Sequence, residues 1–409
     1  MKIKDMKKAI FAASALAATT AFGAGFQVLE QGASNMGTSM AGATVNASND
    51  ASAAYLNPAA VSFIDMEVGQ TMVSTGLSAV LPTLGMSKDG KDYDCACNSF
   101  VPNIFTVHKF TEELFGSLSV TAPFGLESQY DSNWIGRQHG VHSFLLTIDI
   151  NPSVAYKVND WLTIGGGVSA QYAYCKLTQG IAAVPFGEAI ALNASGWGVG
   201  GNIGFTVEYA DGGRFGFQWR SEVCQDVDGT FRLMDVDHGD ITASVSLPQT
   251  FTVGVYQRLF GDLENFAVMA DYSYTAWSCF ENLDIYQGSS LISHTAENWK
   301  DASRVSVGLH YYPEEIEDLT LRFGVCYDES PVKGAQYRTV RIPCSDRIWF
   351  STGFGYDLAE NIKLDMAYVY IMTIGNSEIA PSQYGGSAGD SAHYYGHIHV
   401  ISAQLSFLF

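Results

Sequence analysis

The segment RQHGVHS holds the first residues whose types could support catalysis. His139 and His142 lie three positions apart, Ser143 follows directly, and Asp149 is close by. Such a set could form a nucleophilic triad or half of a metal site. Because residues three apart on a strand point to opposite faces, the two imidazoles do not converge there. The sequence therefore predicts neither an enzyme nor a bound metal or other cofactor.

Cysteines are the other reactive side chains. The chain has seven, an odd number, so at least one stays outside any disulfide bond within the chain. Cys95-Ala96-Cys97 has no second pair at the spacing of a zinc site. We expect all seven in loops or near the outer ends of strands, with some of them paired: Cys95, Cys97, Cys175, Cys224, Cys279, Cys326 and Cys344.

The elements that position these residues follow an export signal. Residues 1–23 have a basic start, an apolar run and a small-residue end, which is typical of a secretory signal peptide cleaved before Ala24. The apolar run is shorter than the roughly 20 residues of a membrane-spanning helix. Its removal takes away four lysines and one aspartate, which changes the formal net charge from −20 to −23. A chain this acidic is a poor partner for nucleic acid.

The mature sequence alternates between apolar and polar residues with a period of two. The C-terminal segment VISAQLSFLF places Ile401, Leu405 and Phe407 on one face, and Ser402 and Gln404 on the other. A soluble sandwich also alternates, so the connections decide between the two folds.

Short and long connections alternate along fourteen predicted strands. Short turns on one rim and long loops on the other are typical of an outer-membrane β-barrel, with the short turns periplasmic. The fold class is therefore all-β, a fourteen-stranded antiparallel barrel closed on itself. The predicted strands are 67–81, 99–110, 115–127, 142–158, 161–177, 193–209, 214–225, 240–259, 264–279, 301–312, 318–329, 346–358, 361–373 and 394–409.

Proline marks irregular places in these strands because it cannot donate to a ladder. Pro102, Pro123, Pro152 and Pro248 each predict a bulge, a kink or a misplaced strand boundary. In TAPFGL, Pro123 and Gly125 flank Phe124, so a strand interrupted there could bend inward and open a gap in the wall.

Residues 24–64 precede the first strand and are rich in small residues, without strand-like alternation or a dense charge run. Small residues allow close packing in a confined space, and Asn57-Pro58 favours a turn. We expect this segment to fold inside the barrel as a plug, in front of a barrel formed by residues 65–409. The alternative is a flexible N-terminal tail.

A resemblance to a known family extends over essentially the whole mature chain. It rests on the N-terminal stretch AGFQVLEQGASNMGTSMAGATVNASNDASAAYLNPAAVSF and on further pieces that follow in order, among them TAPFGLESQY, NPSVAYKVNDWLTIGGGV and SDRIWFSTGFGYDL. With these pieces the chain resembles the FadL family of outer-membrane transporters for long-chain fatty acids and other hydrophobic compounds, and the N-terminal stretch resembles the family's hatch, its name for the plug.

This resemblance implies a hatch-gated lumen and a lateral opening at a kink in the third strand. The hatch element maps to Asn57, Pro58 and Ala59, and the kink maps to Ala122, Pro123, Phe124 and Gly125. Cargo is captured among the outer loops, enters an inner pocket and leaves sideways into the membrane after the hatch shifts.

The resemblance also sets the expected partners. They are hydrophobic small molecules and the lipid of a Gram-negative outer membrane, with the protein a monomer inserted by the barrel-assembly machinery. A fatty acid needs a cation near its carboxylate, and Arg137 and Arg220 are the candidates. Other inward arginines are expected to pair with inward aspartates: Arg304, Arg322 and Arg347 with Asp271, Asp357 or Asp365.

Two other functions remain open on sequence. A general porin for polar solutes needs an unobstructed lumen, which a plug denies it. An adhesin or purely structural barrel needs no ligand. The sequence does not choose between fatty acids, aromatic hydrocarbons and other lipids as cargo.

Overall fold

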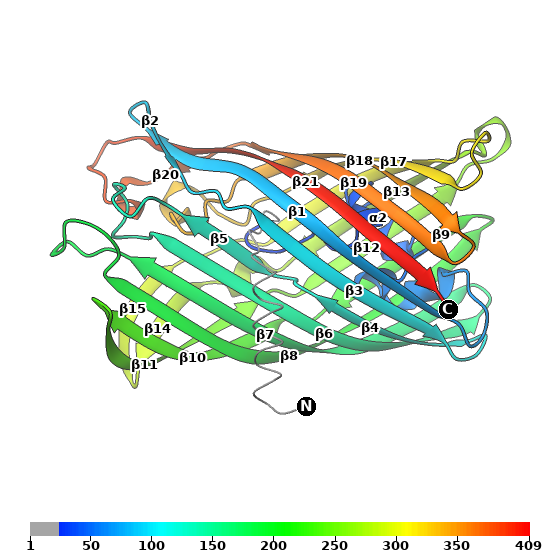
Figure 1. The fold of residues 1–409 in the computed structure, drawn as a ribbon, viewed down its shortest axis with the longest axis horizontal. Helices are drawn as coiled ribbons and strands as arrows, with labels where there is room; N and C mark the ends of the chain where they lie inside the picture. Colours follow the sequence, from blue (N-terminus) through cyan, green and yellow to red (C-terminus); the bar gives the residue numbers. More distant parts are fainter. Residues whose placement is uncertain (1–23) are drawn as a thin grey trace.

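The computed structural model describes residues 24–409, so the predicted signal peptide lies outside the described residues. Within this range, fourteen long strands close into one antiparallel barrel, which confirms the predicted fold class (Figure 1). The ladder between β1 and β21 closes the barrel, from Met72↔Leu408 to Lys88↔Ala392. The wall strands are β1 (Thr71–Lys88), β3 (Ser99–Lys109), β4 (Leu114–Thr121), β6 (His142–Asn159), β7 (Leu162–Gln179), β8 (Ile190–Ala210), β9 (Gly213–Arg220), β12 (Thr250–Arg258), β13 (Phe266–Thr275), β16 (Ala302–Tyr311), β17 (Leu319–Asp328), β18 (Asp346–Ala359), β19 (Ile362–Ile374) and β21 (Ala392–Leu408).

Seven further strands extend this wall or lie at its outer rim. β5 (Gly125–Gln129) continues β4 after an interruption. The hairpin β10–β11 extends β9 and β12 at the outer rim, and the hairpin β14–β15 extends β13 and β16 there. Their bounds, with those of two small outer strands, are β2 (Lys91–Asp94), β10 (Val223–Leu233), β11 (Val236–Leu247), β14 (Asn282–Gln287), β15 (Ser290–Ala296) and β20 (Glu378–Ile379).

The two outer hairpins correct the sequence prediction of long loops at 226–239 and 280–300. Met234 and Asp235 both have left-handed φ angles, 51° and 62°, as a tight two-residue hairpin turn requires. The alternation continues through β10, but its outward positions are acidic, Asp226 and Asp228, because this hairpin does not face lipid. A prediction that requires apolar residues at the outward positions therefore places the end of this strand too early in the sequence.

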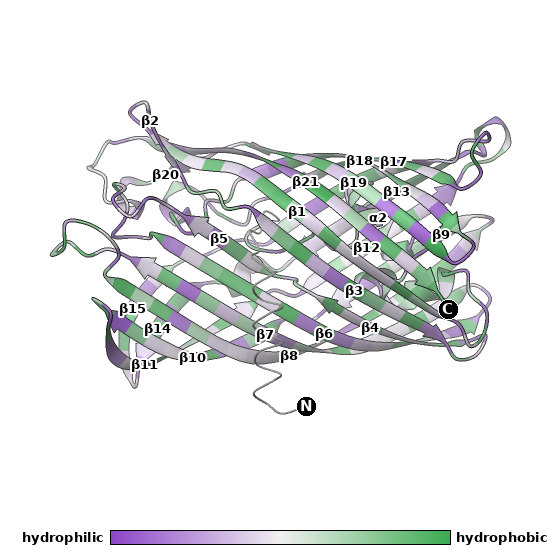
Figure 2. Ribbon diagram, viewed as in Figure 1, coloured by the Kyte–Doolittle hydropathy of each residue, from purple (hydrophilic) through white to green (hydrophobic). Residues whose placement is uncertain are grey.

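The membrane-facing wall alternates as predicted. In β21, Ile401 is exposed while Ser402, Gln404 and Ser406 are buried in the interior. Figure 2 shows the resulting pattern of hydrophobic and hydrophilic bands along the strands. Pro102 lies opposite Leu77 in a ladder without a register shift, so the expected irregularity is absent at that proline. No helix in residues 24–409 is long and apolar enough to cross a membrane.

The N-terminal segment lies inside the barrel, near the rim that carries the short turns (Figure 1). Between Ala24 and Ile64 only Asn49 is exposed. We call residues 24–64 the hatch. It contains α2 (Ala33–Met36), η1 (Ala43–Val45), α3 (Ala53–Leu56) and η2 (Pro58–Phe63). The other helical turns are η3 (Gly261–Leu263), η4 (Trp277–Cys279), η5 (Ala335–Tyr337) and η6 (Pro381–Gln383).

Glycines in the wall make room for the hatch backbone. A Cβ at Gly324 would lie 2.1 Å from the carbonyl carbon of Thr38. At Gly204 it would lie 2.1 Å from Oδ1 of Asn57, and at Gly165, the ladder partner of Gly204, 2.7 Å from the nitrogen of Ala59. These distances leave no space for a side chain unless the hatch moves.

We predict that Gly324→Val displaces the hatch without unfolding the barrel. Valine suits a strand, so the wall tolerates it, but its side chain occupies the place of the Thr38 backbone. Single-channel recording should show a several-fold higher ion conductance than in wild type. Val325→Ile, at the neighbouring exposed position, is the matched control and should conduct as wild type does. Unchanged conductance of a folded Gly324→Val barrel would contradict the packing described here.

Candidate functional site

An apolar cavity of about 390 Å³ lies between the hatch and the outer rim. Its wall comes from β5, β6, β7, β10, β11, β14 and β15, together with the connection between β17 and β18. Residues of these strands supply its apolar surface, including Phe144, Leu145, Leu177, Val245, Leu247 and Leu283. The cavity can therefore hold an extended hydrocarbon away from water.

Two charged groups face this apolar cavity. Arg341 donates to Oγ of Ser143 at 3.0 Å and to Oε1 of Gln179 at 2.8 Å, which fixes its guanidinium at the cavity surface. Glu297 also lines the cavity and accepts from Nε1 of Trp299 at 3.0 Å. Burial lowers the pKa of Arg341 to about 10 and raises the pKa of Glu297 to about 7. At neutral pH the cavity thus presents a cation beside a carboxyl that is partly protonated.

An aromatic cluster forms the floor of the cavity. Phe26 of the hatch packs against Trp277 at 4.8 Å between ring centroids, Phe280 at 5.5 Å, Trp299 at 5.6 Å and Phe124 at 6.0 Å. Phe26 and Phe280 line the cavity, whereas Phe124 lines a smaller chamber next to the hatch. The hatch therefore closes the cavity with a single ring.

The wall is interrupted beside this floor. The ladder of β3 with β4 ends at Ile104↔Val120, and β5 pairs only with β6 in the described residues. Residues 100–103 of β3 consequently have no ladder partner on the side of β5. The chain leaves the sheet at Ala122, Pro123 and Phe124, because proline cannot donate to a ladder.

The hatch takes up the backbone groups that this interruption releases. Gly125 donates its N–H to the carbonyl of Phe26 at 2.9 Å, and Val28 donates to the carbonyl of Pro123 at 2.8 Å. The side chain of Gln31 donates to the carbonyl of Ala122 at 2.9 Å. The interruption at Ala122, Pro123 and Phe124 is thus covered from the inside by the first residues of the hatch.

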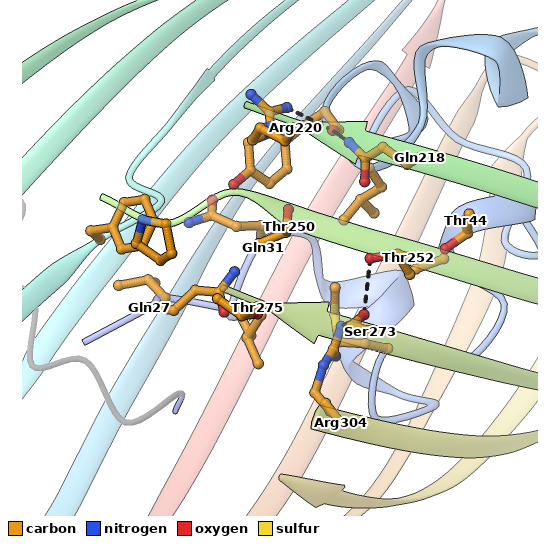
Figure 3. A pocket seen from close by; sticks show the side chains of 18 of the residues that line it. Gln27, Gln31, Thr44, Gln218, Arg220, Thr250, Thr252, Ser273, Thr275 and Arg304 are labelled. Carbon is orange, nitrogen blue, oxygen red and sulfur yellow. Dashed lines mark hydrogen bonds between the residues drawn. The ribbon is translucent and has the colours of Figure 1, made fainter. Parts of the chain in front are cut away.

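A polar chamber of about 70 Å³ lies between one part of the hatch and the wall (Figure 3). Gln27, Gln31 and Gln218 point toward it, and Thr252 and Ser273 hydrogen-bond to each other at 2.9 Å along its side. The polar lining and small volume make this chamber unsuited to an alkyl chain while the hatch is in place.

Neither arginine predicted to bind a carboxylate lines the apolar cavity. Arg220 lines the polar chamber, pairs with Asp149 at 3.4 Å and donates to the carbonyl of Tyr55 at 3.0 Å. Arg137 donates to backbone carbonyls of residues 181–187 and so holds the connection between β7 and β8. The cavity cation is Arg341, which the sequence analysis missed because it lies in a long connection without periodicity.

The residues Asn57, Pro58 and Ala59 anchor the hatch to the wall. Asn57 donates to the carbonyl of Thr44 at 2.8 Å and to that of Phe205 in β8 at 3.3 Å. Its side chain also accepts the N–H of Ala59 at 3.1 Å and caps η2. This motif therefore ties two turns of the hatch to one place on the sheet.

The inward arginines and aspartates that were expected to form ion pairs do not all pair with one another. Arg322 pairs with Asp365 at 2.7 Å, as expected for an inward arginine. Asp271 instead accepts the backbone N–H groups of Gly42 and Thr44, at 2.5 and 3.1 Å, and Asp357 is exposed. The expected pairing of arginine with aspartate is thus wrong for these two carboxylates, because the hatch backbone uses Asp271.

The histidines of RQHGVHS do not converge either. His142 contacts Oε1 of Glu127 at 3.1 Å, whereas His139 lines the apolar cavity.

The expected disulfide pairing is also wrong. Six cysteines are free thiols in the described residues: Cys95, Cys175, Cys224, Cys279, Cys326 and Cys344. Cys175, Cys224 and Cys326 lie on β7, β10 and β17, which are not neighbouring strands, and a disulfide needs Cα atoms within roughly 7 Å.

A closed barrel with an apolar cavity above an N-terminal hatch defines the class of outer-membrane transport proteins. The family described as outer membrane protein transport protein (OMPP1/FadL/TodX) matches residues 14–409, and the chain belongs to this family.

Its similarity to characterised relatives extends over most of the chain. A long-chain fatty acid transport protein of Escherichia coli O6:H1 is 28% identical over 416 residues, covering 89% of this chain and 90% of the relative. Outer membrane protein P1 of Haemophilus influenzae is 27% identical, covering 87% of each. Two crystal structures share the fold: a Pseudomonas aeruginosa FadL homologue (TM-score 0.80, 21% identity, covering 94% of this chain and 99% of the homologue) and the Pseudomonas putida toluene transporter TodX (TM-score 0.70, 17% identity, covering 93% and 99%).

Hatch packing should depend on pH through Glu30. Burial raises the pKa of Glu30 from 4.5 to about 7, so the packed hatch holds a proton that a released hatch loses. Raising the pH from 4.5 to about 7 should therefore loosen the hatch, measured as increasing conductance or protease cleavage. Glu30→Gln should remove this dependence, and Glu67→Gln, at an exposed site, should retain it. Equal pH profiles for wild type and Glu30→Gln would exclude Glu30 as the titrating group.

Proposed function

We propose that this protein takes up long-chain carboxylic acids across the outer membrane, with the apolar cavity as the binding site. The observation that carries the proposal is Arg341, a cation held at the surface of a cavity otherwise suited to hydrocarbon. The names of the E. coli relative and of the toluene transporter give fatty acids and an aromatic hydrocarbon as the two cargo classes to consider. Only the acid has a charge that Arg341 can bind.

Two interactions favour binding in the cavity. Each buried methylene contributes about 0.8 kcal/mol, so the chain length of the acid dominates the affinity. A charge-assisted hydrogen bond from Arg341 adds about 1.5–3 kcal/mol and orients the carboxylate. Partly protonated Glu297 can donate to the same carboxylate, since the acid form of glutamate is a hydrogen-bond donor.

Release requires the hatch to move. Phe26 forms part of the cavity floor, and its backbone carbonyl holds Gly125 at the kink. We infer that withdrawal of residues 26–31 opens the floor and uncovers the kink at Ala122–Gly125, and that the acid then leaves sideways into the membrane. Asn57, Pro58 and Ala59 keep the rest of the hatch attached to β8 during this movement.

A general porin is disfavoured by the buried hatch, whose backbone occupies the lumen beside glycines of the wall. We further propose that the protein is a monomer inserted by the barrel-assembly machinery. The unbroken ladder between β1 and β21, which leaves no strand edge at the closure of the wall, supports this state.

Replacement of Arg341 tests the cargo. Arg341→Gln should weaken binding of a long-chain fatty acid by roughly tenfold or more, because a charge-assisted hydrogen bond is lost. Binding of the alcohol of equal chain length should change little, and Arg341→Lys should restore part of the affinity for the acid. Isothermal titration with purified protein measures both ligands. Equal losses for acid and alcohol would show that Arg341 does not read the carboxylate.

A disulfide between hatch and kink tests the exit route. Gln27 and Phe124 form an antiparallel bridge, so cysteines at both positions can be joined by oxidation. In Gln27→Cys/Phe124→Cys, oxidation should leave fatty acid binding intact and abolish uptake into vesicles, and reduction should restore uptake. Uptake that is equally fast in both redox states would exclude this exit.

A further inference from the structure

A second break in the wall lies between β11 and β14. On the side of the short-turn rim, β12 and β13 are paired along their whole length, from Thr250↔Thr275 to Arg258↔Ala267. On the side of the outer rim, β11 and β14 share two pairs in the described residues, Thr242↔Tyr286 and Ala243↔Ile285. Residues 244–248 therefore have no ladder partner on this side among the described residues, a length of roughly 16 Å at the rise of a strand.

At this break, the apolar cavity and the outer surface share a lining residue. On the inner side, Val245, Leu247 and Leu283 line the cavity. On the outer side, a depression of about 330 Å³ is lined by Ser244, Ser246 and other polar residues. Phe280 lines both the cavity and the depression, so this residue lies between them.

The hatch holds this residue through the same ring that covers the kink. Phe26 packs edge-on against Phe280, with centroids 5.5 Å apart, and edge-on against Phe124 at 6.0 Å. Because one ring contacts both, the break and the kink lie at a similar depth in the wall. Withdrawal of Phe26 removes a packing partner from both openings in one movement.

The outer mouth of the break lies where the lipid-facing surface becomes polar. Below it, Phe251 and Tyr272 are exposed on the outside of β12 and β13. At its edge, Trp219 donates its indole N–H to Oε1 of Gln249 at 3.1 Å. Exposed aromatic residues with such polar contacts mark the membrane interface in barrels, where the carboxylates of amphiphiles lie.

We propose that the break between β11 and β14 is a second side opening, through which long-chain carboxylic acids pass between the membrane interface and the apolar cavity, with Phe280 as its door. The alkyl chain moves along Val245 and Leu247, while the carboxylate moves along the serines of the outer mouth. This route rests on the proposed function, since it requires the cavity to bind such acids. The barrel then has two lateral openings controlled by one hatch residue.

Association and dissociation rates distinguish a residue that blocks the opening, as proposed for Phe280, from a residue that only lines the cavity. The probe is a fluorescent long-chain carboxylic acid mixed in a stopped-flow instrument with the protein in nanodiscs. Phe280→Ala should raise the association rate constant roughly tenfold, equivalent to about 1.4 kcal/mol on the barrier. Leu283→Ala is the matched control, because Leu283 lines the cavity but not the outer depression. It should weaken binding through faster dissociation and leave association unchanged.

A reversible cross-link tests the same proposed opening without replacing Phe280. Sγ of Cys279 lies 3.5 Å from the carbonyl oxygen of Ser246, across the break. Ser246→Cys gives Cys279 a partner, and Cys224→Ser is included because Cys224 is the ladder partner of Ser246. Oxidation should slow association and dissociation by the same factor, roughly tenfold, and leave the affinity unchanged, since a barrier alters rates and not equilibria.

Each outcome decides between the possibilities. Equal association rates in wild type, Phe280→Ala and Leu283→Ala would overturn the proposal, with or without a disulfide. If the cross-link forms, equal rates in its oxidised and reduced states would overturn it as well. A wild-type protein that binds no acid would contradict the proposed function itself, and the route through the break with it. Binding with rates that depend on Phe280 supports both.

Discussion

A barrel of fourteen strands is too wide for its own side chains to fill, and this constraint shapes the rest of the molecule. The segment that fills it brings backbone N–H and carbonyl groups into a buried interior, where each needs a partner. The wall supplies them: Asp271 accepts from Gly42 and Thr44, and Gln404 accepts from Ala33 at 3.2 Å. Glycines of the wall give the space, so wall and hatch are complementary in shape as well as in hydrogen bonding.

The same complementarity separates an apolar compartment from a polar one. Above the hatch, the cavity offers hydrocarbon contacts and one cation, Arg341. Beside the hatch, the chamber next to Arg220 is small and polar. At the interruption of the wall, the aromatic contacts of Phe26 and a few hydrogen bonds from the hatch to Ala122, Pro123 and Gly125 keep the two apart. A seal built from few contacts can be broken at moderate cost, which suits a transporter that must release its cargo.

The sequence predicts the wall far better than the cavity. Strand count, rims and the inward serines of β21 follow from a period of two and from the lengths of the connections, because lipid selects the outward residues. That selection ends at the membrane surface, so the sequence pattern predicts a loop where the structure has the acidic hairpin at Asp226. Arg341 lies in the connection between β17 and β18, whose path no periodicity describes, so its arrival beside Ser143 is visible only in three dimensions. The wall glycines Gly165 and Gly204, which pack against the hatch, are visible in the sequence, since glycine is disfavoured in strands without a close neighbour.

The hatch also bridges the seam at which the first and last strands meet. On the inner side of that seam, Ser78 and Ser402 share a hydrogen bond of 2.7 Å, and Ser78 lies 3.1 Å from the carbonyl oxygen of Glu30. Four residues away on β1, Ser74 contacts Ser406 at 2.7 Å and accepts the N–H of Ala51 at 3.2 Å. The same serine hydroxyl groups therefore join the first strand to the last and hold the hatch in place. A wall left open at this seam would also lack part of the surface that holds the hatch, so the N-terminal segment and the C-terminal strand depend on each other.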